Sequence, residues 1–141
     1  MAYFEDLEVG QAAEASHLID APQIEAFGHA VGDLNPVHFD EEYAATTPFG
    51  GRIAHGMLAG GYISALIASR LPGPGSIYNS QTLDFLRAVR IGDELVVRAS
   101  GGCVVGEVVD RSAHERASSF SVRARPETGV TRRPARSLRR W

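Results

Sequence analysis

Residues 53–71 are the most apolar stretch of the chain and constrain its fold more than any other segment. These 19 residues contain only His55 and Arg70 as groups that carry charge near neutral pH. A stretch of this length must be considered as a membrane span. Three glycines and two serines interrupt it, and no second hydrophobic segment follows. We therefore expect a helix that is apolar all round because a sheet wraps it.

The first 32 residues predict one strand and one helix. Residues 11–18 follow a turn glycine and are expected to form the strand. Asp20 is a good acceptor for the N–H groups at a helix start, and Pro22 suits the first turn. This helix is expected to stop at Gly32.

A loop is predicted over residues 33–40, because Pro36 pushes the preceding residue out of helical geometry. Asp40 then caps a short helix over residues 41–46, which has two acids in its first turn. Residues 47–51 are again expected to be a loop.

The order of elements after the apolar helix predicts an α+β fold. Residues 72–75 alternate proline and glycine and end the helix. Residues 76–90 are expected to form a long, irregular strand, followed by a turn at residues 92–93 and a return strand over residues 94–99. A helix would then pack against one face of a curled antiparallel sheet.

The C-terminal third gives weaker signals. Residues 103–109 and 118–122 could be strands, but no clean fifth strand is evident, and residues 126–141 have no apolar face. Residues 1–97 hold 13 acids and 4 arginines, whereas residues 98–141 hold 10 arginines and 4 acids. The tail lacks a nucleic-acid-binding module, so we expect no nucleic acid partner.

The location is expected to be cytoplasmic. Cys103 is the single cysteine, so no intrachain disulfide can form, and its apolar neighbours favour a packing role. The first residues have neither the basic nor the apolar part of a secretory signal. We expect neither a membrane anchor nor a metal site, and no phosphate-binding glycine loop is present.

Asp33 and His38 are the candidate catalytic residues. A carboxylate and an imidazole five positions apart in a tight Asn-Pro loop can converge on one water molecule. Such a pair can move a proton onto or off a carbon beside a polarised carbonyl, because imidazole titrates near working pH. Asn35 would fix the loop or orient the water. Each residue alone also suits a plainer role, Asp33 in a turn and His38 at the surface.

Gly56 is the candidate donor to a developing negative charge. It lies where the apolar helix begins, so its N–H is not used within the helix and carries the positive end of the dipole. The absence of a side chain lets a substrate approach closely. His55 beside it is expected to orient or cap rather than to act as a second acid, and the orientation of Ser64 is undecided.

The motif resembles that of the MaoC-like, (R)-specific enoyl-CoA hydratases, which have the hot-dog fold. The resemblance rests on Asp33-x-Asn35-Pro36-x-His38-x-Asp40, on residues 44–50 and on Ile53-Ala54-His55-Gly56-Met57, and it spans roughly residues 4–97. It implies reversible hydration of trans-2-enoyl-CoA to (R)-3-hydroxyacyl-CoA, in fatty acid or polyhydroxyalkanoate metabolism.

The resemblance also implies the roles of the site residues. Asp33 and His38 would be the catalytic pair, and Gly56 the donor to the thioester oxygen. We expect the substrate to contact Asn35, Phe49, His55, Met57 and Ser64. The substrate would be a thioester of CoA or of acyl carrier protein, no cofactor would be needed, and the protein would be a homodimer.

The domain organisation is expected to be one hot-dog domain over residues 1–141. Residues 1–98 follow the family pattern, whereas residues 99–141 depart from it, are arginine-rich and are expected to be disordered in part. The abrupt change of composition fits either a reading-frame shift in a GC-rich gene or a genuine divergent tail. Two other functions stay open: a subunit that binds acyl thioesters without turnover, and an acyl-CoA thioesterase.

Overall fold

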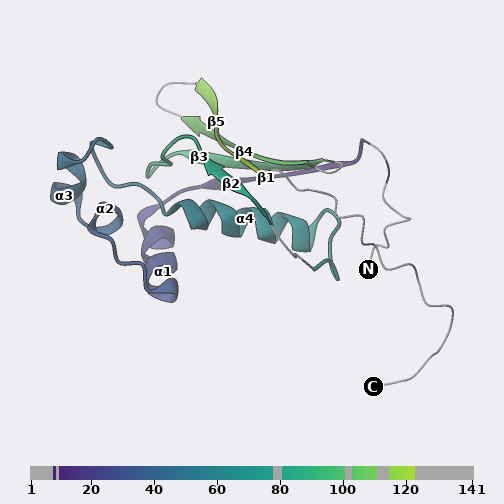
Figure 1. The fold of residues 1–141 in the computed structure, drawn as a ribbon, viewed down its shortest axis with the longest axis horizontal. Coiled ribbons are helices and arrows are strands. Elements are labelled where there is room, and N and C mark those ends of the chain that lie inside the picture. The colour runs from purple at the N-terminus through teal and green to yellow at the C-terminus, as the bar shows by residue number, and fades with distance from the viewer. Residues whose placement is uncertain (1–7, 9, 78–80, 101–102, 111–114, 123–141) are drawn as a thin grey trace, which may run out of the picture.

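The described part of the chain is an antiparallel sheet along one side of a long helix, with three shorter helices at one end (Figure 1). The computed structural model describes residues 8, 10–77, 81–100, 103–110 and 115–122, the last two segments by their backbone alone. The strands, in the order in which they neighbour one another, are β1 (Ala12–Leu18), β3 (Glu94–Ser100), β4 (Cys103–Asp110), β5 (Glu115–Val122) and β2 (Leu83–Phe85). The predicted α+β class is confirmed.

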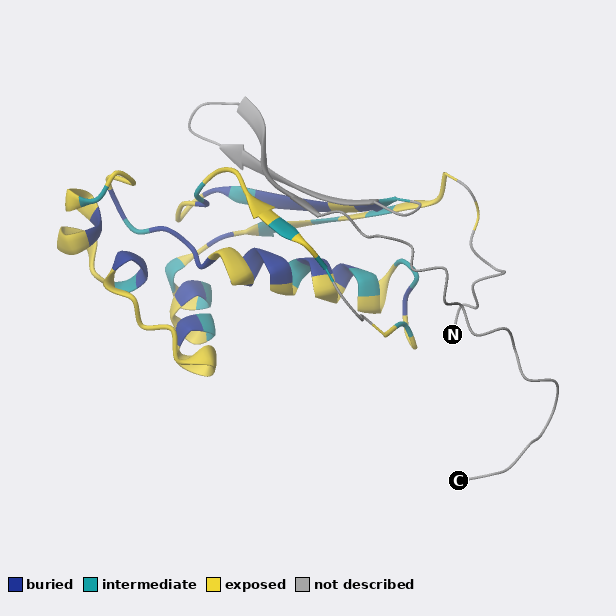
Figure 2. Cartoon of the chain, viewed as in Figure 1, coloured by how far each residue is buried: buried dark blue, intermediate teal, exposed yellow. Residues whose placement is uncertain are grey.

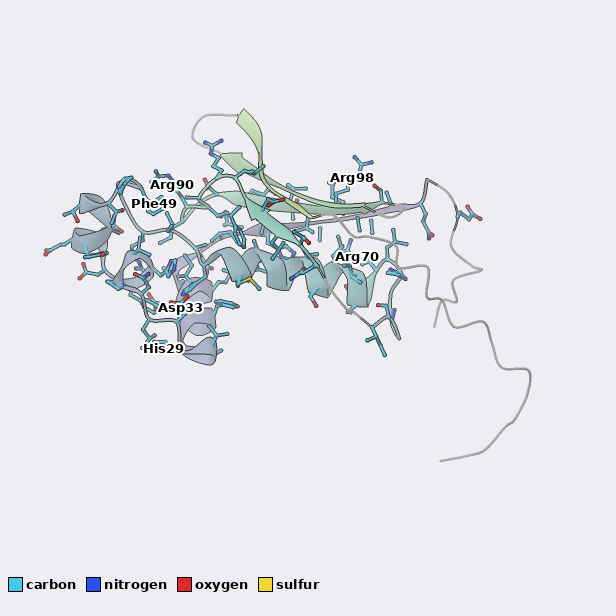
Figure 3. All side chains as sticks on the ribbon, in the orientation of Figure 1. His29, Asp33, Phe49, Arg70, Arg90 and Arg98 are labelled. Carbon is cyan, nitrogen blue, oxygen red and sulfur yellow. The ribbon has the colours of Figure 1, made fainter. Side chains whose placement is uncertain are left out.

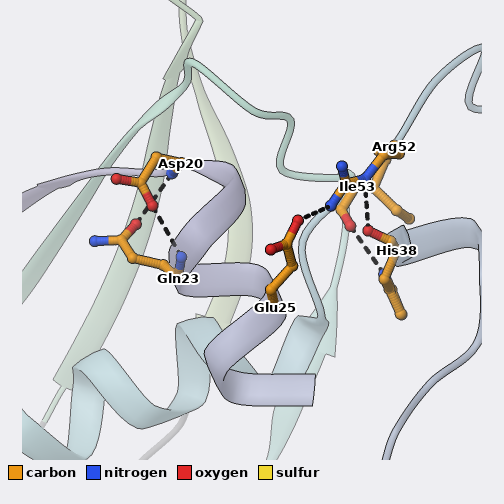
Figure 4. Close-up of polar contacts among 6 residues, drawn as sticks. All are labelled: Asp20, Gln23, Glu25, His38, Arg52 and Ile53. Atoms are coloured by element: carbon orange, nitrogen blue, oxygen red, sulfur yellow. Dashed lines mark hydrogen bonds and ion pairs between the residues drawn. The ribbon is translucent and has the colours of Figure 1, made fainter. Parts of the chain in front are cut away.

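Helix α1 (Ala21–Val31) begins and ends where the sequence predicts. The Asp20 carboxylate accepts the Gln23 N–H at 2.9 Å, and the Gln23 side-chain oxygen accepts the Asp20 N–H at 3.0 Å (Figure 4). This reciprocal pair satisfies two N–H groups at the helix start. Gly32 adopts a φ of 77°, the left-handed conformation that ends many helices.

The loop predicted over residues 33–40 is wrong in its second half, where α2 (Pro36–Phe39) forms one helical turn. Pro36 occupies the first helical position, where an N–H would have no partner within the helix and the fixed φ is already suitable. The Asn35 side chain accepts the Val37 N–H at 3.3 Å and so caps the turn. The proline that keeps Asn35 out of helical geometry therefore starts a helix itself.

Helix α3 (Glu41–Thr46) follows directly and matches the prediction. Asp40 accepts the Tyr43 N–H at 3.0 Å, as expected of an N-terminal cap. The buried Ala44 packs with Val37 and Ile53 in a small second core. This core ties α2 and α3 to the segment that leads into the long helix.

The long helix α4 (Gly56–Ser69) is buried on one side only (Figure 2). Its buried residues are Leu58, Ala59, Gly60, Ile63 and Leu66. They share a core with residues of β3, and each fully buried aliphatic side chain contributes roughly 2–3 kcal/mol. The opposite side includes the exposed residues Met57, Gly61, Ser64 and Ala65. The expectation of a helix covered all round is therefore wrong for the described chain, because the sheet lies on one side of it.

The length of α4 also bears on the membrane alternative. The helix has 14 residues, because residues 53–55 of the apolar stretch precede it in non-helical conformation and residues 70–71 follow its end. Among the described helices, none has the length and apolar character needed to cross a bilayer.

The long strand predicted over residues 76–90 is wrong. Within its described part only Leu83–Phe85 joins the sheet, as β2, and it pairs with β5. The chain then leaves the sheet edge, and the Val89 carbonyl accepts the Ala54 N–H at 2.8 Å. The predicted turn is present, with Gly92 at a φ of 94°. Strand β3 therefore returns to pair with β1 and β4 instead of with the residues just before the turn.

The expectation that no clean fifth strand exists is also wrong, because β4 and β5 complete a five-stranded sheet. Their pairing shifts register between Gly106 and Glu107, which interrupts the alternation that a sequence pattern relies on. The expectations for residues 123–141 lie outside the described residues.

We predict that Gly28→Ala destabilises the protein by about 1–3 kcal/mol, the usual cost of overpacking. A Cβ at Gly28 would lie 2.5 Å from Cζ of Phe39 and 2.9 Å from the Asp33 carbonyl oxygen, so the turn between α1 and α2 would have to shift. The measurement is the free energy of unfolding in urea. Gly51→Ala is the matched control, since its Cβ would meet the flexible end of Glu41 at 3.1 Å. Equal stability of the two variants would contradict the prediction.

Candidate active site

A cavity of about 460 Å³ opens beside the first turn of α4. Its lining residues are Asp33, His38, Phe49, Ile53, Ala54, His55, Gly56, Met57, Ala59, Phe85, Leu86, Arg87, Ala88 and Val89. They come from residues around α2, from the chain between α3 and the first turn of α4, and from the end of β2 and the residues after it. Figure 3 shows Phe49 and Arg90 together at the end of the molecule that carries Asp33, and Arg90 donates a hydrogen bond to the Phe49 carbonyl.

Hydrogen bonds to main-chain carbonyls join the α2 segment to the segment before α4. The Ile53 N–H donates to the Val37 carbonyl at 3.3 Å, and His38 Nδ1 donates to the Ile53 carbonyl at 2.8 Å. Arg52 Nε donates to the His38 carbonyl at 2.8 Å (Figure 4). Arg52 also pairs with Glu25 of α1 at 3.3 Å. The two segments therefore hold each other at a fixed separation.

The hydrogen bond to Ile53 determines the state of the buried His38 ring. Because a carbonyl oxygen can only accept, Nδ1 carries the proton and Nε2 of the neutral ring keeps a free lone pair. Burial of the ring lowers the pKa of His38, and the neighbouring His55 lowers it further. The hydrogen bond to Ile53 and the nearby Asp33 oppose this effect without cancelling it. His38 is thus suited to accept a proton at Nε2 near neutral pH.

Asp33 lies at the cavity beside this ring. Its carboxylate accepts the Asn35 N–H at 3.3 Å, and its side chain is otherwise exposed toward solvent. One ligand atom from each of Asp33, His38 and His55 lies within 4.8 Å of the others. The structure therefore brings the predicted pair together, with His55 as a third member.

These three residues could in principle hold a divalent cation, since two imidazoles and a carboxylate are common metal ligands. The rings of His38 and His55, however, pack against each other, with centroids 3.8 Å apart and planes tilted by 30°. Nδ1 of His38 and Nε2 of His55 already bond to main-chain carbonyls, and the remaining nitrogen of His55, Nδ1, is buried. The geometry suits hydrogen bonding to a small molecule better than chelation.

Gly56 is the first residue of α4 and lines the cavity. N–H groups in the first turn have no acceptor within the helix and lie at its positive end. A Cβ at Gly56 would lie 2.8 Å from Cε1 of Phe85, so glycine is needed for this close packing as well as for access. The site therefore offers a donor next to the carboxylate and the imidazole.

The remaining predicted residues divide into two groups. Phe49 and Met57 line the cavity, whereas Asn35 and Ser64 are not among the described residues that line it. The Asn35 side chain caps α2 instead, which is the loop-fixing alternative. Ser64 lies on the exposed side of α4, two turns beyond Gly56.

Sequence reasoning missed the wall formed by residues 85–89. These residues line the same cavity as the catalytic candidates, but the sequence pattern placed them in a long strand. The strict alternation of apolar and polar residues ends after Phe85, which indicates that the strand is interrupted there. This pattern did not indicate where the following segment would lie.

Comparison with known proteins places the chain among proteins of one family. Residues 7–119 match the family model described as the MaoC like domain. Over 96 residues the chain is 51% identical to the 3-hydroxybutyryl-CoA dehydratase of Methylorubrum extorquens, covering 68% of this chain and 61% of that protein. Over 91 residues it is 52% identical to the (R)-specific enoyl-CoA hydratase of Rhodospirillum rubrum, covering 64% and 63% respectively. The chain thus aligns with less than two thirds of the length of either relative.

The fold is similar to that of a solved enzyme. The structure of the (R)-hydratase from Aeromonas caviae involved in PHA biosynthesis superposes with a TM-score of 0.74 at 33% sequence identity. The match covers 85% of this chain and 96% of that one.

We predict that His38 titrates below the ordinary histidine value of 6.5. Since the unfolded chain would then bind this proton first as the pH falls, the contribution of His38 to stability is present above pH 6.5. It declines as the pH falls toward the folded-state pKa. An NMR titration, assigned with His38→Ala, measures the midpoint. A midpoint above 6.5 would contradict the prediction.

Proposed function

This chain belongs to the MaoC-like dehydratase family, and on that premise we propose that it reversibly hydrates trans-2-enoyl-CoA to (R)-3-hydroxyacyl-CoA. Of the relatives described above, the Methylorubrum extorquens protein is named a dehydratase and the Rhodospirillum rubrum protein a hydratase. These names correspond to the two directions of such a reaction. One observation carries the proposal: the Asp33 carboxylate and the His38 ring meet in one cavity beside the start of α4.

In the hydration direction, Asp33 and His38 hold and activate one water molecule. Nε2 of His38 takes a proton from it, the water oxygen bonds to C3, and the electrons of the double bond move onto the thioester as an enolate. The proton then returns to C2, which restores the carbonyl. No group is oxidised or reduced, so Asp33 and His38 suffice for the proton transfers.

The Gly56 N–H stabilises the negative charge that develops on the thioester oxygen. A donor of this kind contributes on the order of 3 kcal/mol in comparable sites. The apolar side chains of Phe49 and Met57 would hold the acyl group against the wall of residues 85–89. We infer no direct substrate contact for Asn35, because its side-chain oxygen already accepts a main-chain N–H.

We propose further that residues 1–141 form one hot-dog domain, in which the sheet curls around the buried side of α4. The similarity to the Aeromonas caviae enzyme supports this arrangement. That enzyme is described as involved in PHA biosynthesis, and we propose an equivalent place in acyl-thioester metabolism for this chain.

We predict that Asp33→Asn and His38→Asn each lower the rate of crotonyl-CoA hydration by about 100- to 10,000-fold, the range for lost general acid–base catalysis. The asparagine at position 38 can still donate to the Ile53 carbonyl but has no atom in place of Nε2. The loss of absorbance of the enoyl thioester measures the rate, and circular dichroism checks the fold.

Asp40→Asn is the matched control, because asparagine also caps a helix and Asp40 does not line the cavity among the described residues. Unchanged rates in both site variants would refute the catalytic assignment. Release of free thiol would identify a thioesterase, and binding of crotonyl-CoA without turnover would identify a binding subunit.

We propose that the protein is a homodimer, since large apolar side chains remain exposed in the single chain. Ile77, Leu86, Phe85 and Met57 are 85%, 63%, 53% and 53% exposed. Light scattering is expected to give about twice the chain mass of 15.1 kDa, as closed two-fold dimers are the commonest assembly. A mass equal to that of one chain at micromolar concentration would contradict this prediction.

A further inference from the structure

We propose that His55 is a positioning residue, whose ring holds the Asp33 main chain and supports the His38 ring from its face. The inference rests on the proposed function and assigns His55 a role apart from substrate contact.

The hydrogen bonding of His55 excludes a capping role. His55 occupies the N-cap position of α4, yet its side chain makes no capping hydrogen bond. Nε2 instead lies 3.0 Å from the Asp33 carbonyl oxygen, to which it must donate because a carbonyl only accepts. The side chain therefore joins the start of α4 to the residue that carries the catalytic carboxylate.

Aromatic rings fix the orientation of His55. The ring centroids of Phe27 and Phe39 lie 5.2 and 6.0 Å from that of His55, and the centroid of the tilted His38 ring lies 3.8 Å from it. His55 is 3% exposed, and Nδ1 is a buried atom without a hydrogen-bond partner among the described residues. A proton on Nδ1 would find no acceptor there, so these surroundings select the tautomer with its proton on Nε2.

This arrangement matters because Asp33 is otherwise weakly held. Its carboxylate is exposed and accepts one hydrogen bond, from the main-chain N–H of Asn35. At 3.3 Å this hydrogen bond is long. The bond from His55 fixes the main chain of Asp33, and the His55 ring packs against that of His38. Loss of this bond would let the Asp33 carboxylate move away from Nε2 of His38. A misplacement of about 1 Å can lower a rate by about 100-fold.

Two substitutions at position 55 test the role. His55→Leu fills the apolar surroundings without a donor, and we expect kcat for crotonyl-CoA hydration to fall by about 100-fold while KM changes by less than about 3-fold. His55→Gln keeps an amide N–H near the position of Nε2 and should recover most of kcat. His29→Leu is the control, because His29 is exposed, contacts Phe39 and is not among the described residues that line the cavity.

An unchanged kcat in His55→Leu, or a glutamine variant as impaired as the leucine variant, would overturn the positioning role. A second measurement does not depend on turnover. Long-range ¹H–¹⁵N spectra of the resting protein should show His55 protonated at Nε2 and unprotonated at Nδ1. The opposite tautomer would overturn the inference by itself, whereas wild-type protein that fails to hydrate crotonyl-CoA would overturn the proposed function instead.

Discussion

The site depends on hydrogen bonds that two short segments donate to each other's main-chain carbonyls. From the α2 side, His38 donates to Ile53; from the α4 side, Ile53 and His55 donate to Val37 and Asp33. Carbonyl oxygens of the main chain cannot move independently of the chain, so the bonds from His38 and His55 each fix a side chain to the opposite segment. The bond from the Ile53 N–H to Val37 joins the two main chains directly. The result is a fixed His38 ring and a fixed Asp33 main chain, from which the exposed carboxylate extends beside the imidazole.

The packing of the hydrophobic core places the two segments where these hydrogen bonds can form. Ile63 and Leu66 fix α4 against the sheet, and the helix start therefore has a defined position from which Gly56 presents its N–H. On the other side, the close contact of Gly28 with Phe39 lets α1 approach α2, and Phe39 in turn contacts His55. Packing at a distance from the cavity thus determines where its polar atoms lie, because a well-packed interior transmits small displacements.

The sequence predicts well the interactions between residues that are close together along the chain. The caps at Asp20 and Asp40 and the pairing of Asp33 with His38 each involve residues at most five positions apart, so spacing alone indicates them. The bond from His55 to Asp33 spans 22 positions and depends on how α1 and α4 pack. The predicted long strand with its return strand was wrong for the same reason, since β2 pairs with β5 and not with β3, which follows it along the chain. No periodicity encodes a choice between distant partners.

The cavity therefore has two walls of different origin. The wall with the catalytic candidates is held by the reciprocal hydrogen bonds and by buried rings, so most substitutions there would disturb the chemistry. The wall of residues 85–89 is joined to the first by the bond from Ala54 to Val89 and is exposed at Leu86. Under the proposed function, a change of side chain at Leu86 would alter the space for the acyl group without removing any bond that positions Asp33 or His38. The proposed proton transfers would then be separate from the selection of the acyl chain.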